Sequence, residues 1–217
     1  MFKRKRKNAG KRSQLITYSN PDSIVSDQFR AIRTNINFLT EKRKNRIFII
    51  TSPGDGEGKS TTTANLAVSM AQQKESILLI DANLRDPIIH DVFKVPNDLG
   101  LTSILSGKAK LENIIKRTGI GNLEILTSGA NLFNPAELLG NEQMTELLKT
   151  VADMYDIVLI DSPPVLESTE TRVLANQCDG VVLVLNRGKT ELEKTVESRR
   201  VLELAHARLV GAIINEK

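Results

Sequence analysis

The residues best suited to chemistry form one short loop that follows an apolar run, residues 47–50. The loop consists of Gly54, Asp55, Gly56, Glu57, Gly58, Lys59, Ser60 and Thr61. Its glycines let the backbone turn tightly, so that successive N–H groups can point at phosphate oxygens. Lys59 adds a mobile positive charge, and the Ser60 hydroxyl suits a Mg²⁺ ion. The loop therefore predicts a nucleotide phosphate site rather than a plain surface turn, although Pro53 replaces the first glycine of the usual pattern.

Two aspartates stand in a second recurring pattern. Asp81 ends the apolar run 76–80, and Asp161 ends the run 155–160. An aspartate at the carboxyl end of a buried parallel strand lies at the edge of the sheet where ligands bind. Mg²⁺ prefers oxygen ligands and keeps several waters, so one hydroxyl and one or two carboxylates suffice to hold it. Either aspartate alone could simply open a loop, but both together with Lys59 and Ser60 indicate a magnesium–nucleotide site.

The surrounding pattern alternates between strands and helices. Apolar runs predict strands at 46–51, 76–81, 123–127, 156–161, 180–186 and 209–214. Helical patterns cover 22–39, 61–72, 142–154, 169–177 and 190–206, with shorter pieces at 87–93, 101–105 and 111–115. This order predicts an α/β protein of the P-loop NTPase type, with a mostly parallel central sheet and helices on both faces. One domain, residues 21–217, would follow a basic, flexible leader, residues 1–20.

The charge of the chain is concentrated in that leader. Residues 1–12 contain seven Lys and Arg and no acid, so the rest of the 217-residue chain is net negative although the whole carries +4. Such a leader is either a solvated tail or a contact for an anionic membrane face. The aromatic content of 4% argues against a base-stacking platform for specific nucleic acid. The single cysteine, Cys178, favours a reducing, cytoplasmic compartment.

The chain resembles the bacterial tyrosine kinases of the P-loop type, the cytoplasmic kinases that govern capsule and exopolysaccharide synthesis in Firmicutes. The resemblance rests on the loop and on the strand motifs that end in Asp81 and Asp161, together with residues 100–105 and 134–139. It implies binding of ATP and Mg²⁺ at the loop. Lys59 would stabilise the transferred phosphoryl group, and Ser60 would bind the metal. Asp161 would order the water shell of the metal, while Asp81 would accept the tyrosine proton or assist the metal.

The same resemblance implies partners. Such kinases phosphorylate tyrosines in the tail of a neighbouring subunit, and the cytoplasmic tail of a membrane adaptor recruits and activates them. Their docking motif on the first helix corresponds to Asp27, Arg30 and Arg33 here, which predicts a ring of like subunits. Residues three apart share one face of a helix, so a solvated row of ion pairs is the alternative interpretation.

Three departures from the family pattern leave other functions open, and the first is Asp27, which is one carbon shorter than the glutamate of the family's docking motif. Asn83 stands where a second acid is usual, so it can offer an oxygen to the metal but cannot act as a base. The sequence stops at Lys217, where the family's tyrosine-rich tail would begin, so either that tail has been removed or the substrate tyrosines lie elsewhere. Gly54 replaces the lysine that the related partition and division-site ATPases carry in this loop, which favours a kinase. The alternatives are an ATPase switch of that partition type and a nucleotide-binding pseudo-kinase that acts as a scaffold.

Overall fold

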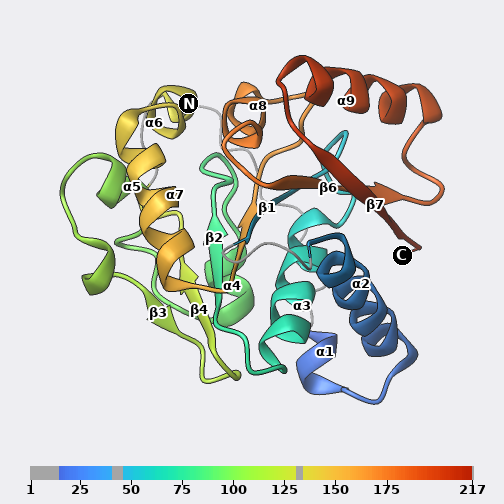
Figure 1. The fold of residues 1–217 in the computed structure, drawn as a ribbon, viewed down its shortest axis with the longest axis horizontal. Helices are drawn as coiled ribbons and strands as arrows, with labels where there is room; N and C mark the ends of the chain where they lie inside the picture. Colours follow the sequence, from blue (N-terminus) through green and yellow to red (C-terminus); the bar gives the residue numbers. More distant parts are fainter. Residues whose placement is uncertain (1–14, 41–45, 131–133, 217) are drawn as a thin grey trace, which may run out of the picture.

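A parallel β-sheet forms the centre of the molecule in a computed structural model that describes residues 15–40, 46–130 and 134–216. The sheet has seven strands in the order β3-β4-β2-β5-β1-β6-β7, and helices cover both of its faces (Figure 1). The strands are β1 (Arg46–Thr51), β2 (Ile77–Asp81), β3 (Lys116–Arg117), β4 (Leu123–Leu126), β5 (Ile157–Asp161), β6 (Gly180–Asn186) and β7 (Leu209–Asn215). All neighbouring strands are parallel except β3, which runs antiparallel to β4. The expected fold class is confirmed.

The helices follow the strands along the chain. They are α1 (Ile16–Ser19), α2 (Ile24–Thr40), α3 (Lys59–Ala71), α4 (Ile89–Phe93), α5 (Leu101–Leu105), α6 (Pro135–Leu139), α7 (Glu142–Met154), α8 (Thr169–Ala175) and α9 (Leu192–Leu204), with a short 3₁₀ turn at Leu111–Asn113. Six predicted strands and the longer predicted helices are present, with ends displaced by a few residues. The largest displacement at the site is at α3, which begins at Lys59 rather than at residue 61.

Two hydrophobic cores lie on opposite faces of the sheet. Alternate residues of a strand point to opposite faces, so Ile49 joins the core beneath α5, α7 and α8, while Phe48 joins the core beneath α2 and α3. Both side chains are fully buried. Because every central strand is buried on both faces, it appears in the sequence as an unbroken apolar run. This packing fixes the carboxyl ends of the strands along one edge.

The N-terminal boundary differs from the prediction. Residues 15–20 belong to the predicted flexible leader, yet they contain α1, and the side chain of Thr17 is buried against α3. Its backbone N–H and its hydroxyl both donate to the Asn65 side-chain oxygen, at 3.1 and 3.0 Å. The prediction of a flexible leader is therefore wrong for this stretch, because tertiary hydrogen bonds stabilise a helix that is too short to form alone. Residues 1–14, with the basic run, lie outside the described residues.

Candidate active site

The predicted phosphate loop connects the end of β1 to the start of α3. Gly56 and Gly58 have φ angles of +71° and +89°, a left-handed conformation that costs glycine little and other residues more. Gly58 is the N-terminal cap of α3, so the first turn of the helix, with Lys59 and Ser60, opens at the loop. An alternation of right- and left-handed residues before a helix N-terminus forms a concave row of N–H groups that suits phosphate.

The two predicted aspartates lie side by side. Asp81 pairs with Asp161 in the register of β2 and β5, and both side chains are fully buried at the carboxyl ends of these strands. The Asp81 carboxylate accepts hydrogen bonds from the backbone N–H groups of Asn83, at 3.2 Å, and Ile89, at 3.1 Å. Asp161 accepts one from the Thr63 hydroxyl of α3 at 3.2 Å. The sheet therefore brings two carboxylates together directly behind the loop.

Burial and proximity make both carboxylates reluctant to ionise. Desolvation, followed by the negative charge of Asp161, raises the pKa of Asp81 well above its usual range. Desolvation also raises the pKa of Asp161 to about 6, although hydrogen bonding from Ser60 and the positive charge of Lys59 limit the rise. Two adjacent buried carboxylates repel each other, and a cation between them would relieve that repulsion. This electrostatic arrangement is typical of functional sites.

A divalent cation with a bound nucleotide fits these residues. Oδ2 of Asp161 is buried and has no hydrogen-bond partner among the described residues, which is unusual for a carboxylate oxygen in a folded protein. Ser60 is also buried, and its hydroxyl interacts with the same carboxylate. A hydroxyl and carboxylate oxygens are the ligand types that Mg²⁺ takes beside phosphates.

Lys59 is buried at the same place. Its Nζ lies 3.3 Å from a carboxylate oxygen of Asp55, whose own side chain is largely exposed. An exposed carboxylate is held weakly by such a contact, so phosphate oxygens can replace it as the partner of the lysine. Of the remaining predicted loop residues, Thr61 is half-buried in the first turn of α3.

Asn83 and Arg85, which follow β2, both hydrogen-bond to other groups of the protein. The Asn83 side chain donates to the Asp86 carbonyl at 3.0 Å and accepts from the Asp86 N–H at 3.4 Å, so it closes a turn after β2. Arg85 donates through Nε to Glu170 of α8 at 2.7 Å. The contact of Arg85 is thus an ion pair with a buried carboxylate, and the metal-binding role of Asn83 stays a prediction.

Two glutamates accept hydrogen bonds from the loop backbone: Glu57, which is part of the predicted loop, and Glu167, which the sequence analysis does not name. Glu57 is buried, which raises its pKa, and it accepts a hydrogen bond from the Gly54 N–H at 3.3 Å. Glu167, from the segment after β5, accepts one from the Asp55 N–H at 3.3 Å. Glu57 was predicted as a loop residue without a separate role. Glu167 carries no local signal, because only the fold brings residues 55 and 167 together.

The predicted docking residues on α2 differ in exposure. Asp27 and Arg30 form an ion pair of 3.0 Å on the surface, with 69% and 35% of their side chains exposed. Arg33 is buried and donates to the Ser69 carbonyl of α3. Within this chain Arg33 therefore joins α2 to α3, and only Asp27 and Arg30 lie where a neighbouring subunit could contact them.

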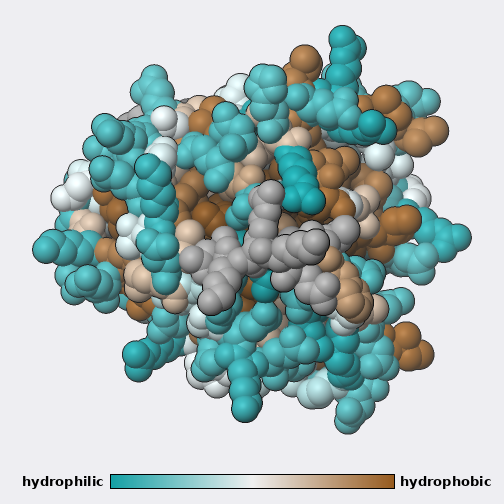
Figure 2. All heavy atoms as spheres, in the orientation of Figure 1, coloured by the Kyte–Doolittle hydropathy of each residue, from teal (hydrophilic) through white to brown (hydrophobic). Residues whose placement is uncertain are grey.

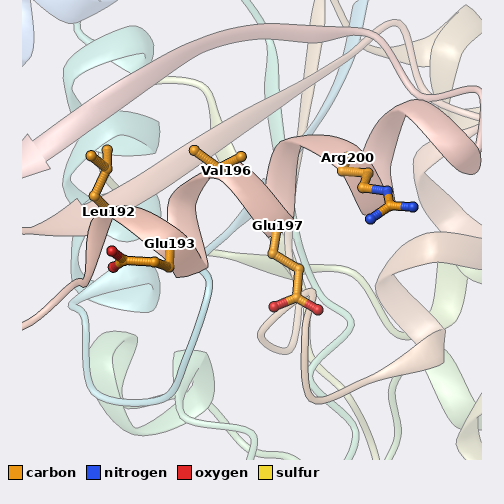
Figure 3. Close-up of a pocket in the computed structure, with 5 residues that line it drawn as sticks. All are labelled: Leu192, Glu193, Val196, Glu197 and Arg200. Carbon is orange, nitrogen blue, oxygen red and sulfur yellow. The ribbon is translucent and has the colours of Figure 1, made fainter.

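The surface beyond the site carries scattered hydrophobic side chains. Figure 2 shows brown patches among hydrophilic residues on the side of the molecule that carries α2, α9 and the end of β7. A shallow depression along α9 is lined by Leu192, Glu193, Val196, Glu197 and Arg200 (Figure 3). All five come from a single exposed helix face, so we assign them no part in the chemistry at the loop. None of the described helices is long and apolar enough to cross a membrane.

The loop, its helix and the two strand-end carboxylates together define a P-loop nucleotide-binding domain. The protein family described as an AAA domain matches residues 44–198. The solved kinase domain of Escherichia coli tyrosine kinase ETK superposes with a TM-score of 0.90 at 32% identity, covering 98% of this chain and 84% of that chain. The septum site-determining protein MinD complexed with Mg-ADP, from Pyrococcus horikoshii OT3, has a TM-score of 0.68 at 30% identity, covering 78% and 70%.

The sequence relatives identify the family within that class. Tyrosine-protein kinase YwqD of Bacillus subtilis (strain 168) is 44% identical over 214 residues, which are 98% of this chain and 90% of the relative. The chain belongs to the family of bacterial tyrosine-protein kinases. The resemblance inferred from the sequence motifs is confirmed.

Proposed function

We propose that this protein is an autophosphorylating protein-tyrosine kinase that uses ATP and Mg²⁺ and regulates extracellular polysaccharide synthesis together with a membrane adaptor. The main structural support for the proposed phosphoryl transfer is the buried pair of Asp81 and Asp161 directly behind the loop that contains Lys59. MinD bound to Mg-ADP is a relative of the same fold, which supports the same cofactor here. The identity with the Bacillus subtilis kinase supports the reaction.

Some residues of the site would position the nucleotide and the metal ion, and others would stabilise charge or accept a proton. Lys59 and the loop amides would hold the phosphates, and Ser60 and Asp161 would hold Mg²⁺ with Asn83 nearby. The ion, when bound, neutralises charge that develops on the transferred phosphoryl group. Asp81 would accept the proton of the substrate tyrosine, since its raised pKa makes it a better base than an exposed aspartate. Most of the catalytic effect in phosphoryl transfer comes from such positioning and electrostatic stabilisation.

The assembly is part of the proposal. Asp27 and Arg30 would contact a neighbouring subunit in a ring, while Arg33 supports the helix that presents them. The adaptor's cytoplasmic tail would bring the protein to the inner face of the membrane, and the basic residues of 1–12 would add attraction for anionic lipid. Transfer would then occur between subunits, and an added phosphate on a neighbour would loosen the ring by charge repulsion.

The test uses the whole chain with labelled ATP, Mg²⁺, a synthetic adaptor tail and a tyrosine-containing polymer. We expect phosphotyrosine in the polymer, and we expect its loss in Lys59→Met with an unchanged circular dichroism spectrum, because charge-assisted bonds to phosphate depend on this ammonium. Undiminished phosphotyrosine from folded Lys59→Met would contradict the role of the loop.

An ATPase switch is the second candidate, favoured by the likeness to MinD. It predicts release of inorganic phosphate at the rate of ATP consumption, with no label in tyrosine. The same experiment separates the two, because a kinase transfers label to the polymer and an ATPase transfers it to water.

A further inference from the structure

The phosphate loop is held from outside by two side chains that come from the other end of the chain. Lys189 lies in the turn between β6 and α9, and its Nζ donates to the backbone carbonyl of Asp55. Asn215 is the last residue of β7, and its Nδ2 donates to the backbone carbonyl of Glu57 at 3.0 Å. Neither residue belongs to the loop, to α3 or to the aspartate pair.

These two contacts decide which way the loop amides face. A peptide unit is planar and trans, so its C=O and N–H groups point in opposite directions. The carbonyl of Asp55 shares a peptide with the N–H of Gly56, and the carbonyl of Glu57 shares one with the N–H of Gly58. Holding both carbonyls outward therefore turns both glycine N–H groups inward, and within the described residues neither of these N–H groups donates a hydrogen bond.

The fit between the side chains and the loop is close. A Cβ added to Gly56 would lie 2.7 Å from Nζ of Lys189, and one added to Gly58 would lie 2.2 Å from Nδ2 of Asn215. The turn that carries Lys189 is itself ordered by backbone hydrogen bonds from Lys189 and Thr190 to the Asn186 carbonyl, at 3.1 and 2.9 Å. Asn215 is fixed in register opposite Asn186 at the ends of the paired strands β7 and β6.

We propose that Lys189 and Asn215 are positioning residues of the nucleotide site, which hold the phosphate loop in its binding shape through the Asp55 and Glu57 carbonyls. This inference rests on the proposed binding of ATP at the loop. In their absence the two peptides can rotate, and their N–H groups no longer converge. The nucleotide must then reorganise the loop as it binds, which weakens its affinity but leaves the reacting groups in place once ATP saturates the site.

The experiment measures the dissociation constant of a fluorescent ATP analogue with Mg²⁺ for the whole chain. We expect Lys189→Met and Asn215→Ala each to raise it about tenfold, the effect of one charge-assisted or well-placed hydrogen bond. Lys189→Arg keeps a cationic donor and should restore most of the affinity. Lys194→Met is the matched control, since Lys194 is an exposed lysine of α9 whose ion-pair partner in the described part of the chain is Glu191, on the same surface.

Steady-state kinetics distinguish a residue that positions the phosphate loop from one that only stabilises the fold. We expect the KM for ATP to rise in Lys189→Met while kcat stays within about threefold, with the urea midpoint of unfolding unchanged. Lys189 is exposed, so this variant folds even if Asn215→Ala does not. A dissociation constant for Lys189→Met within twofold of wild type would overturn the inference, as would a wild type that binds no nucleotide. If wild type binds the analogue but transfers no phosphate to tyrosine, the proposed kinase function fails, and the binding constants still decide the role of Lys189.

Discussion

The ion pair between Arg85 and Glu170 permits a quantitative prediction. Arg85 follows β2, and Glu170 lies in the first turn of α8, so the pair joins the segments that leave the two strands of the aspartate pair. The Glu170 side chain is 1% exposed, whereas that of Arg85 is 61% exposed. Burial alone would raise the pKa of Glu170, but hydrogen bonds from Ser168 and Arg85, among others, outweigh burial and lower it. Glu170 is therefore ionised at neutral pH and depends on its donors.

Replacing Arg85 by methionine keeps a long side chain and removes the donor. A hydrogen bond to a charged group contributes about 1.5–3 kcal/mol, and the exposure of Arg85 places this one at the lower end because solvent screens its charge. We expect the free energy of unfolding to fall by roughly 1.5 kcal/mol and Tm by about 3–6 °C for a domain of this size.

The loss should depend on pH in a defined direction. A carboxyl whose folded-state pKa is lowered contributes stability above its unfolded pKa of about 4.3, and this contribution disappears as the pH falls through the folded-state value. Urea unfolding followed by circular dichroism should therefore show a deficit for Arg85→Met at pH 7 that disappears at an acidic pH below the folded-state pKa of Glu170. Arg199→Met, which removes an exposed i,i+4 pair, serves as the control and should change little at either pH. Equal stability of Arg85→Met and wild type at pH 7, combined with lost activity, would show that Arg85 contacts substrate instead.

Three further substitutions test separate parts of the structure. Asn83→Asp removes the donor to the Asp86 carbonyl, so we expect the free energy of unfolding in urea to fall by about 1–2 kcal/mol, and the phosphotransfer rate to rise by less than about tenfold. Asn65→Ala removes the side-chain acceptor for Thr17, so amide hydrogen exchange in α1 should accelerate while exchange in the sheet stays slow. Tyr155→Phe should leave phosphate incorporation unchanged in phosphopeptide mapping, because the Tyr155 hydroxyl is part-buried and bonded to a carboxylate.

The sequence alone predicts those strands and site residues that a short stretch of neighbouring residues identifies. Each central strand is an apolar run, and the polar residue at the end of such a run lies at the ligand-binding edge of the sheet. This rule predicts the positions of Asp81 and Asp161. Asn215 ends the run of β7 at the same edge, so the same rule could have selected it. It was not selected because no second motif drew attention to that strand.

Other features depend on contacts that only the fold creates. Lys189 and Glu167 reach the loop across more than a hundred residues of sequence, and nothing near either residue distinguishes it from a surface charge. The strand β3 contains only Lys116 and Arg117, so it lacks the apolar pattern by which strands are recognised. The short helix α1 likewise exists through its hydrogen bonds to α3 rather than through its own propensity.

The rate of phosphate transfer to tyrosine by Asp81→Asn tests most directly whether the aspartate pair performs the reaction. This substitution keeps the size of the side chain and an acceptor for one of the two backbone N–H groups, of Asn83 and Ile89, that now donate to separate oxygens of Asp81, while it removes the base. At saturating ATP and Mg²⁺ we predict that the initial rate falls at least about 10²-fold, with the affinity for the fluorescent ATP analogue within a few-fold of wild type. A folded Asp81→Asn protein that phosphorylates tyrosine at nearly the wild-type rate would contradict the assignment of the reaction to this pair of aspartates.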